Sequence, residues 1–373
     1  MPENKEILSP AKILYLLAIV ISLIGLFFVF EASVAEAFQQ FGNQYYFVTQ
    51  QSLWLVVGVI LMTIASFLPV KLWKFLSTYI YIGSVLMLIL VFIPGIGKQI
   101  NGASRWFELA GFTFQPVEAV KLGVVFFYAK WMSQHQKIIP FLFLTGIPIL
   151  LIMLQPDLGS TLILVSIAFG MFFLAGGEIK KFSLMSLLGI LAIFLLILVQ
   201  PYRLRRLTTF LNPESDPLGA SFHIRQITLA LGNGGLLGQG IGKSRQKYSY
   251  IPEASTDSIF AIVAEEIGFV GSLGIIGLYF LFFLTGFQVL KNQPKKSFEY
   301  LLAAGILIWI SSQVLLNLSA VVALVPLTGL PLPLFSYGGS ALVMVLLAIG
   351  ILISLGKNSK DHKKSKLSEK LHL

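Results

Sequence analysis

Long apolar runs alternate with short polar segments along almost the whole chain. A run of about 17 to 25 apolar residues can cross the ~30 Å hydrocarbon core of a bilayer as a helix. Runs of this kind lie at roughly 12–31, 47–68, 74–94, 114–133, 138–154, 158–176, 182–200, 258–290, 300–325 and 339–355. The pattern predicts an all-α polytopic membrane protein with about ten transmembrane helices, which form a single integral membrane domain over residues 1–356.

The positions of Lys and Arg predict the orientation of these helices. Short cytoplasmic loops of membrane proteins carry an excess of Lys and Arg. With the N-terminus in the cytoplasm, the short outer loops hold only Lys98 and Arg105, and most other Lys residues fall inside. Ten spans then return the C-terminus to the cytoplasm. The Lys-rich segment 357–373 is expected to be a disordered basic tail that lies against anionic lipid.

A large extracytoplasmic loop, residues 201–257, precedes the eighth span. It is expected to contain a helical stretch at 221–231 and a Gly-rich run at 232–242. Long structureless loops are uncommon and are often functional, and long loops translocate regardless of their charge. The cations of this loop favour a phosphate-bearing ligand, although anchoring to lipid headgroups explains some of them. These cations are Arg203, Arg205, Arg206, Arg225, Lys243, Arg245 and Lys247.

The junction between this loop and the eighth run, residues 251–266, is the strongest candidate for chemistry. Ser255 or Thr256 can cap the helix, which would place Asp257 in its first turn, where exposed N–H groups favour an anion. A carboxylate beside an apolar wall at the mouth of a membrane protein is a candidate acid or base. The alternative is that Asp257 only helps to start the helix.

The eighth apolar run is too long for one simple span. Residues 268–290 alone would cross the bilayer, so residues 258–267 are expected to extend the helix at the outer interface. This extension places Glu265 and Glu266 near the lipid headgroups, where most of their desolvation cost would be removed.

Two further charged groups lie within apolar runs. Glu118 and Lys121 are one turn apart in the fourth run, where each charge costs about 2.5–3.5 kcal/mol on insertion scales. An ion pair at this spacing offsets part of that cost, so the two form an internal packing pair or line a polar cavity. Asp157, in the segment QPDLGS, either caps the sixth span or binds a cation.

Two Gly-containing loops complete the candidates. The segment SYGGS, from Ser336 to Ser340, follows two prolines and is expected to be a non-helical outer loop that is buried in protein or lines a wet cavity. The segment GQGIGKS, residues 238–244, is one residue short of the nucleotide-binding loop pattern and follows no strand. We therefore reject a nucleotide site there, and a backbone nest for a pyrophosphate is a weak alternative.

Composition supports the membrane assignment and excludes several other classes. The chain is 56% hydrophobic and 12% charged, about half the charge of a soluble domain. It has no Cys, which excludes disulfides and thiol chemistry, and its four His residues are scattered. No basic motif with interleaved aromatic residues is present, so a nucleic-acid partner is not expected. The first apolar run is long enough to span rather than to be a cleaved signal.

These segments together resemble the SEDS family (shape, elongation, division and sporulation), which comprises FtsW, RodA and SpoVE. The resemblance covers nearly the whole chain. Within the family, residues 242–248 and 252–254, together with the Asn-Pro and Asp-Pro pairs at 212–217, resemble the division branch, FtsW. Ser255 stands where the family commonly has His. The matching segments are GASRW (102–106), QPVEAVK (115–121), QPDLGS (155–160), 202–217, 252–266, PLP (331–333) and SYGGS (336–340).

The resemblance implies a peptidoglycan glycosyltransferase of the bacterial cytoplasmic membrane, acting at the division septum. Its substrate would be lipid II, a disaccharide-pentapeptide on undecaprenyl pyrophosphate. The aspartate that matches Asp257 is the expected catalytic residue, and a divalent cation (Mg or Mn) is expected, with no organic cofactor. The implied partners are a class B penicillin-binding protein and the divisome subunits.

Our hypothesis is that Asp257 acts as general base or orients the acceptor sugar. Arg203, Arg206, Lys243 and Arg245 would bind the pyrophosphate. Glu118, Lys121, Asp157, Ser336 and Ser340 would shape the substrate cavity. The alternatives are a lipid II flippase, which the lack of an obvious inverted repeat disfavours, a RodA-like polymerase of elongation, and a scaffold that only recruits the penicillin-binding protein.

Overall fold

The computed structural model is a mainly helical bundle. It describes residues 9–100, 103–109, 112–135, 137–178, 180, 183–184, 187–189, 191, 201–212, 221–244, 246 and 254–371. The helices are α1 (Pro10–Phe41), α2 (Tyr46–Phe67), α3 (Val70–Leu90), α4 (Pro116–Met132), α5 (Ile138–Leu154), α6 (Leu158–Leu174), α8 (Pro201–Leu211), α9 (Phe222–Gly234), α10 (Ile259–Lys291), α11 (Phe298–Val321) and α12 (Gly339–Leu371).

Most of the predicted spans coincide with helices to within a few residues. Among the described residues, six helices are long and apolar enough to cross a membrane: α1, α2, α3, α10, α11 and the part of α12 up to Lys357. Helices α5 and α6 are apolar but shorter. The predicted span at 182–200 lies almost entirely outside the described residues, so a polytopic helical fold is confirmed and the count of ten stays a prediction.

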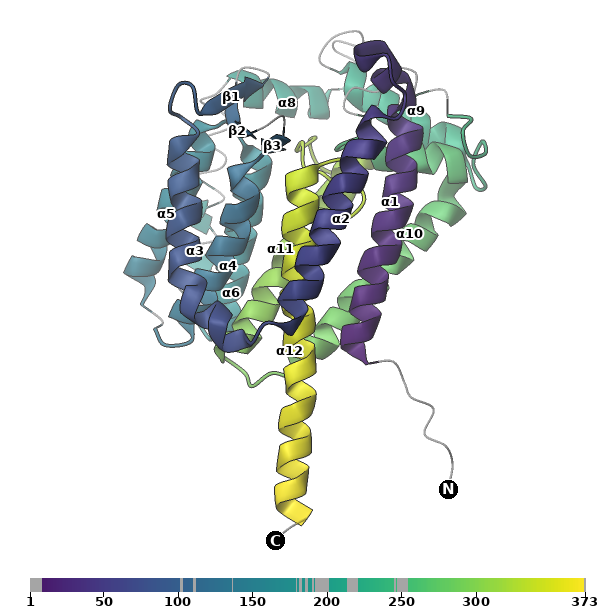
Figure 1. Ribbon diagram of the computed structural model, residues 1–373. Helices are drawn as coiled ribbons and strands as arrows, with labels where there is room; N and C mark the ends of the chain where they lie inside the picture. Colours follow the sequence, from purple (N-terminus) through teal and green to yellow (C-terminus); the bar gives the residue numbers. More distant parts are fainter. Residues whose placement is uncertain are drawn as a thin grey trace, which may run out of the picture.

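Helices α8 and α9 and a small sheet lie at one end of the bundle (Figure 1). The start of α1 and the end of α12 lie at the opposite end. Helix α2 packs along α12, α1 packs against α10, and α4 and α6 both pack against α11. The close approach of α2 and α12 depends on Gly350, where a Cβ atom would collide with the Met62 backbone. Small residues at such crossings are typical of membrane helices.

Two expectations about regular structure need correction. The fold is not all-α, because the segment before α4 forms an antiparallel sheet of β1 (Gly97–Ile100), β2 (Ala103–Leu109) and β3 (Phe112–Phe114). Its strands are too short to show the alternation of apolar and polar residues that predicts a strand. An ion pair between Lys98 and Glu108, at 2.7 Å, joins β1 to β2. The basic tail, expected to be disordered, continues α12 to Leu371, since Lys, Leu and Glu favour helix.

Helix α10 is broken at Gly268, where the sequence predicts that the span begins. Gly268 has φ 67° and ψ −170°, which lies in a region that is essentially restricted to Gly. A break of this kind leaves helical N–H and C=O groups without partners, and at membrane depth such groups must be satisfied within the protein. The predicted stretch at 258–267 is helical from Ile259, but the break separates it from the rest of α10, whereas the sequence predicts a continuous extension.

The Gly-rich run after α9 provides the missing partners of the break. Its backbone forms a short ladder with the broken helix, so glycines of the run serve backbone pairing. Gly268 and Gly238 both have positive φ and lie so close that a Cβ atom on Gly268 would collide with the Gly238 nitrogen. The bonds of the ladder are Gln239 N to Glu265 O (2.9 Å), Gly240 N to Glu266 O (3.0 Å), Phe269 N to Gly235 O (2.9 Å) and Val270 N to Leu236 O (3.1 Å).

The substitution Gly268→Ala is expected to destabilise the protein. An L side chain in this backbone conformation costs about 1–3 kcal/mol, and the added Cβ atom meets the Gly238 backbone. The measurement is the apparent unfolding temperature in detergent. Gly274→Ala is the matched control, because Gly274 lies on the same helix with open space around its Cβ position. Equal unfolding temperatures for the two variants would show that the break does not require glycine.

Candidate active site

Asp257 lies in a turn, residues 254–258, that immediately precedes α10. The helix begins at Ile259 with Ser258 as its N-cap residue, so the expectation that Ser255 or Thr256 caps the helix and that Asp257 sits in its first turn is wrong. The turn is held away from helical geometry by bonds to other elements. Tyr337 N donates to Ser255 O at 2.8 Å, and the Asn317 side chain donates to Asp257 O at 2.8 Å.

A chain of hydrogen bonds connects Asp257 to α9. The Ser258 hydroxyl donates to Asp257 Oδ1 at 3.3 Å, and His223 Nε2 lies 2.8 Å from the same hydroxyl oxygen. Ser258 is fully buried, and Asp257 and His223 are half-buried. Sequence reasoning missed His223, because a single histidine 34 residues before Asp257 gives no local signal.

Burial determines the charge of His223. It lowers the pKa of His223 to about 4, since the imidazolium is poorly solvated there, and the nearby Arg206 guanidinium lowers it further. His223 is therefore neutral at pH 7. Tyr337, on the loop that bonds the turn, has a pKa raised to about 12, first by burial and then by Tyr46 and Glu36. The turn thus has neutral hydrogen-bonding neighbours and a guanidinium close to its histidine.

The predicted phosphate-binding cations are only partly placed. Arg206 lies on α8, where its Nη1 donates to Leu327 O at 2.9 Å, and its charge acts on His223. Arg203 is on the same helix, but the structure does not describe its side chain. Arg245 lies outside the described residues. Lys243 is exposed at the end of the Gly-rich run, and no contact with Asp257 is seen.

Glu265 and Glu266 are not solvated, contrary to the expectation that most of their desolvation cost would be removed. Each is only 1% exposed, because the loop after α9 covers them and provides donors in place of water. The Ser244 hydroxyl donates to Glu265 Oε2, and Ser244 N donates to Glu266 Oε1 at 3.4 Å. These two carboxylates therefore fix the loop that carries Lys243.

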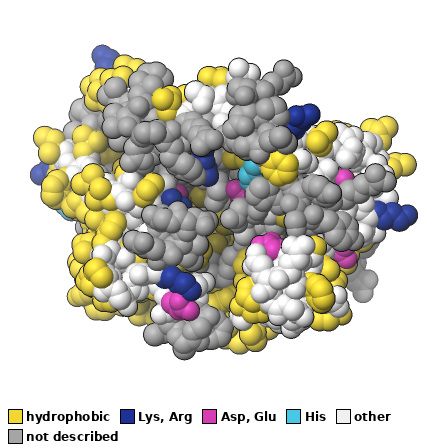
Figure 2. Space-filling view, turned by 90° about the horizontal axis from the view of Figure 1, so that it is seen from above, with side chains coloured by type: hydrophobic (Ala, Val, Ile, Leu, Met, Phe, Trp, Pro, Cys, Tyr) yellow, Lys and Arg dark blue, Asp and Glu magenta, His cyan; other side chains and the backbone are white. Residues whose placement is uncertain are grey.

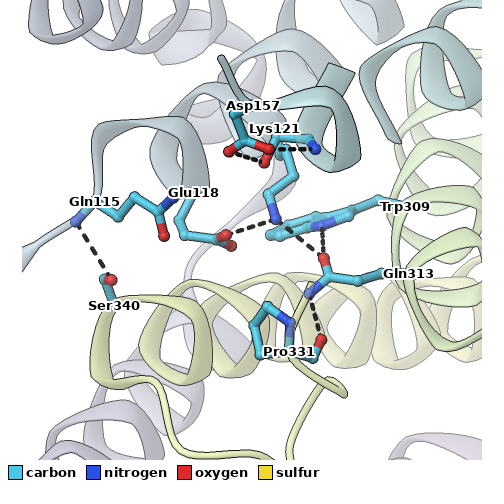
Figure 3. Close-up of polar contacts among 9 residues, drawn as sticks. Gln115, Glu118, Lys121, Asp157, Trp309, Gln313, Pro331 and Ser340 are labelled. Carbon is cyan, nitrogen blue, oxygen red and sulfur yellow. Dashed lines mark hydrogen bonds and ion pairs between the residues drawn. The ribbon is translucent and has the colours of Figure 1, made fainter. Parts of the chain in front are cut away.

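Glu118 and Lys121 form the predicted ion pair inside the bundle (Figure 3). Lys121 Nζ donates to Glu118 Oε1 at 2.7 Å and to Gln313 Oε1 at 3.0 Å. Gln313 also accepts a bond from Trp309 at 3.1 Å and donates to Pro331 O at 2.9 Å. Since Lys121 is 0% and Glu118 2% exposed, the pair joins α4, α11 and the loop before α12, as the packing alternative predicts.

The remaining predicted cavity residues hold backbone segments in place. Both carboxylate oxygens of Asp157 are used, since Oδ1 accepts from Ser160 N at 2.9 Å and Oδ2 from the Ser160 hydroxyl at 2.8 Å. Asp157 is thus the N-cap of α6. Ser336 Oγ accepts from Leu332 N at 2.8 Å, and Ser340 Oγ accepts from Gln115 N at 3.3 Å. These three side chains support the loops at this end of the bundle.

The face that carries α8, α9 and the sheet has a polar centre. Figure 2 shows basic, acidic and histidine side chains close together around a hollow near its middle, with hydrophobic side chains toward the edge. In the part of the chain that the structure describes, no group of three or more His, Asp or Glu side chains forms a metal cage. Mg²⁺ is commonly bound by one or two carboxylates together with substrate phosphates, and the lone carboxylate of this turn fits that kind of site.

Comparison with known proteins places these features in a family. The sequence profile described as "Cell cycle protein" (FtsW/RodA/SpoVE) matches residues 11–361. The chain belongs to the FtsW/RodA/SpoVE family. Stage V sporulation protein E of Bacillus subtilis (strain 168) is 37% identical over 360 residues, which covers 94% of this chain and 98% of that protein. The "Probable peptidoglycan glycosyltransferase FtsW" of Geobacter sp. (strain M18) is 35% identical over 351 residues, with 92% and 95% covered.

Solved structures agree with the family assignment. A chain from the structure described as "Structural coordination of polymerization and crosslinking by a peptidoglycan synthase complex" is similar with a TM-score of 0.74 at 30% identity, covering 93% of this chain and 97% of that one. The crystal structure of rod shape determining protein RodA from Thermus thermophilus gives a TM-score of 0.68 at 29% identity, with 93% and 96% covered. The chain is a multi-pass membrane protein of the FtsW/RodA/SpoVE family.

The substitution Lys121→Met is expected to destabilise this family member strongly. It leaves the buried Glu118 carboxylate without its cation, which typically costs about 3–5 kcal/mol. The apparent unfolding temperature in detergent should fall, and Glu118→Gln in the same chain should restore part of the loss. Lys130→Met on the same helix is the control, because Lys130 is half-buried and bonds only Thr78 among described side chains. Equal stability of the two single variants would contradict a structural role for the pair.

Proposed function

We infer that the chain is a peptidoglycan glycosyltransferase that polymerises lipid II into glycan strands. Membership of the FtsW/RodA/SpoVE family and the names of the FtsW relatives support this activity. The observation that carries it is the turn before α10. It holds a half-buried carboxylate, Asp257, next to a neutral imidazole, at the end of the bundle opposite both termini. That is where an enzyme needs a base for a substrate anchored in the outer leaflet.

The chemistry is a displacement at the anomeric carbon of the donor sugar. The 4-hydroxyl of the acceptor GlcNAc forms the new C–O bond, and the bond to the lipid pyrophosphate breaks. Asp257 takes the hydroxyl proton, or orients the hydroxyl, because a sugar hydroxyl is a poor nucleophile without a positioned base. The leaving pyrophosphate carries the negative charge, and Arg206 with Arg203, Lys243 and Arg245 of the same loop supplies cations for it.

A divalent cation, Mg or Mn, would add to that stabilisation. Asp257 is the residue of the turn suited to hold it, together with the phosphate oxygens of the substrate. When bound, the cation neutralises charge on the pyrophosphate. No organic cofactor is part of this proposal.

The setting of the enzyme is also proposed from the family. Ten spans with both termini in the cytoplasm would place Asp257 outside the cytoplasmic membrane, where lipid II is polymerised. A class B penicillin-binding protein is the proposed partner, since a similar chain lies in a peptidoglycan synthase complex. The FtsW relatives favour a role with divisome subunits at the septum, and a RodA-like role in elongation or a sporulation role remains the alternative.

The substitution Asp257→Asn should abolish polymerisation of purified lipid II while leaving folding and partner binding intact. The amide is nearly isosteric but cannot take a proton. The measurement is glycan strand length on gels, for the full chain with its partner in proteoliposomes, with and without a chelator. A chelator should reduce the wild-type rate, and added Mg²⁺ should restore it.

Three results would contradict parts of this proposal. Normal strands from the Asn variant would remove Asp257 from the reaction. Movement of fluorescent lipid II across the bilayer without strand growth would identify a flippase. Normal cell-wall synthesis in cells that carry only the Asn variant would leave the chain a role as a scaffold for the penicillin-binding protein.

A further inference from the structure

The hydrogen-bond chain at the turn can run in one direction from His223 to Asp257. A serine hydroxyl has one hydrogen and can donate only one bond at a time. In the arrangement in which Ser258 donates to Asp257 Oδ1, the 2.8 Å contact between Ser258 Oγ and His223 Nε2 is donated by the histidine. The Nε2–H of His223 then bonds Ser258, and the hydroxyl hydrogen of Ser258 is directed at the carboxylate.

We propose that His223 is a positioning residue, which fixes the Asp257 carboxylate through the Ser258 hydroxyl. This proposal rests on the proposed function of Asp257. Without His223, the Ser258 oxygen loses the bond that holds it in place, so its bond to the carboxylate is less well directed. A carboxylate whose orientation is less well fixed spends less time in the orientation that the acceptor hydroxyl needs, and such losses of orientation reduce the rate of reaction.

The surroundings of His223 favour a role as a hydrogen-bond donor to Ser258 rather than a role as a general base. The ring is half-buried on α9, and Arg206 on α8 is the charged side chain that acts on it. A neutral imidazole carries a single N–H, which Nε2 holds when it donates to Ser258. Because the imidazolium is disfavoured by burial and by the guanidinium, the proton from the acceptor sugar does not move to His223.

The surrounding bonds make the contact between α9 and α10 a fixed feature of the site. Asn317 holds the backbone of Asp257 on one side. On the other side, the ladder at the α10 break ties the loop after α9 to residues 265–270 of α10. Ser258 is fully buried, so its hydroxyl depends on protein partners.

The test is a double-mutant cycle on the full chain with its partner in proteoliposomes, with lipid II as the probe. His223→Leu and Ser258→Ala should each lower kcat about three- to tenfold, the range expected for one neutral hydrogen bond, with KM unchanged. The double variant should be no slower than the slower single variant, because both changes break the same chain. His223→Gln, which keeps an N–H at a similar reach, should restore most of the rate.

Controls separate this proposal from a structural effect and from the proposed function. Ser272→Ala removes another buried serine hydroxyl from α10 and should leave the rate unchanged. Ser258→Ala removes one oxygen only, so it tests the link even if His223→Leu does not fold. Independent, multiplicative losses, or no rescue by His223→Gln, would overturn the positioning role. Wild-type rates for both single variants would do the same, provided that Asp257→Asn is inactive. An active Asp257→Asn would instead overturn the proposed function.

Discussion

Two side-chain amides on one face of α11 hold the outer end of this protein together. The Gln313 side chain accepts a hydrogen bond from the buried Lys121 ammonium and donates one to Pro331 O. One turn further along, Asn317 donates to Leu330 O and to Asp257 O. Through these two amides, the charge buried within the bundle and the turn that carries Asp257 are linked to adjacent carbonyls of the same loop. At membrane depth an unsatisfied polar group costs several kcal/mol, so none of these bonds can be given up cheaply.

The break in α10 provides the second constraint on the turn. A continuous helix from residue 259 to 291 would fix the direction of its outer end by the direction of its membrane part. The break at Gly268 allows the outer segment to take its own direction, and the Gly-rich run after α9 then joins it. The same join brings α9 beside the start of α10, which places His223 at Ser258. A backbone feature therefore determines a side-chain contact at the site.

The sequence predicts those features that local spacing controls. Membrane thickness determines the length of apolar runs, so span boundaries such as those of α2 and α5 are predicted well. The length of the eighth run predicts that the membrane part of the helix begins at residue 268, although not that the helix is broken there, and one-turn spacing predicts the pair of Glu118 with Lys121. The contacts of His223 and Asn317 with the turn could not be predicted, because they depend on how α9 and α11 approach it. The burial of Glu265 and Glu266 was missed for the same reason, since a loop more than 20 residues earlier covers them.

The position before Thr256 shows why proximity in the sequence is a poor guide to this site. A histidine is common there in the family that the sequence resembles, but this chain has Ser255, which is buried and uses its carbonyl to bond Tyr337 N. The imidazole that the turn does have comes from α9, and it reaches Asp257 only through Ser258. What the turn requires is a donor held at a fixed place beside the carboxylate. Any element that the fold brings close enough can supply that donor, so a motif match at the turn cannot identify every residue that positions its aspartate.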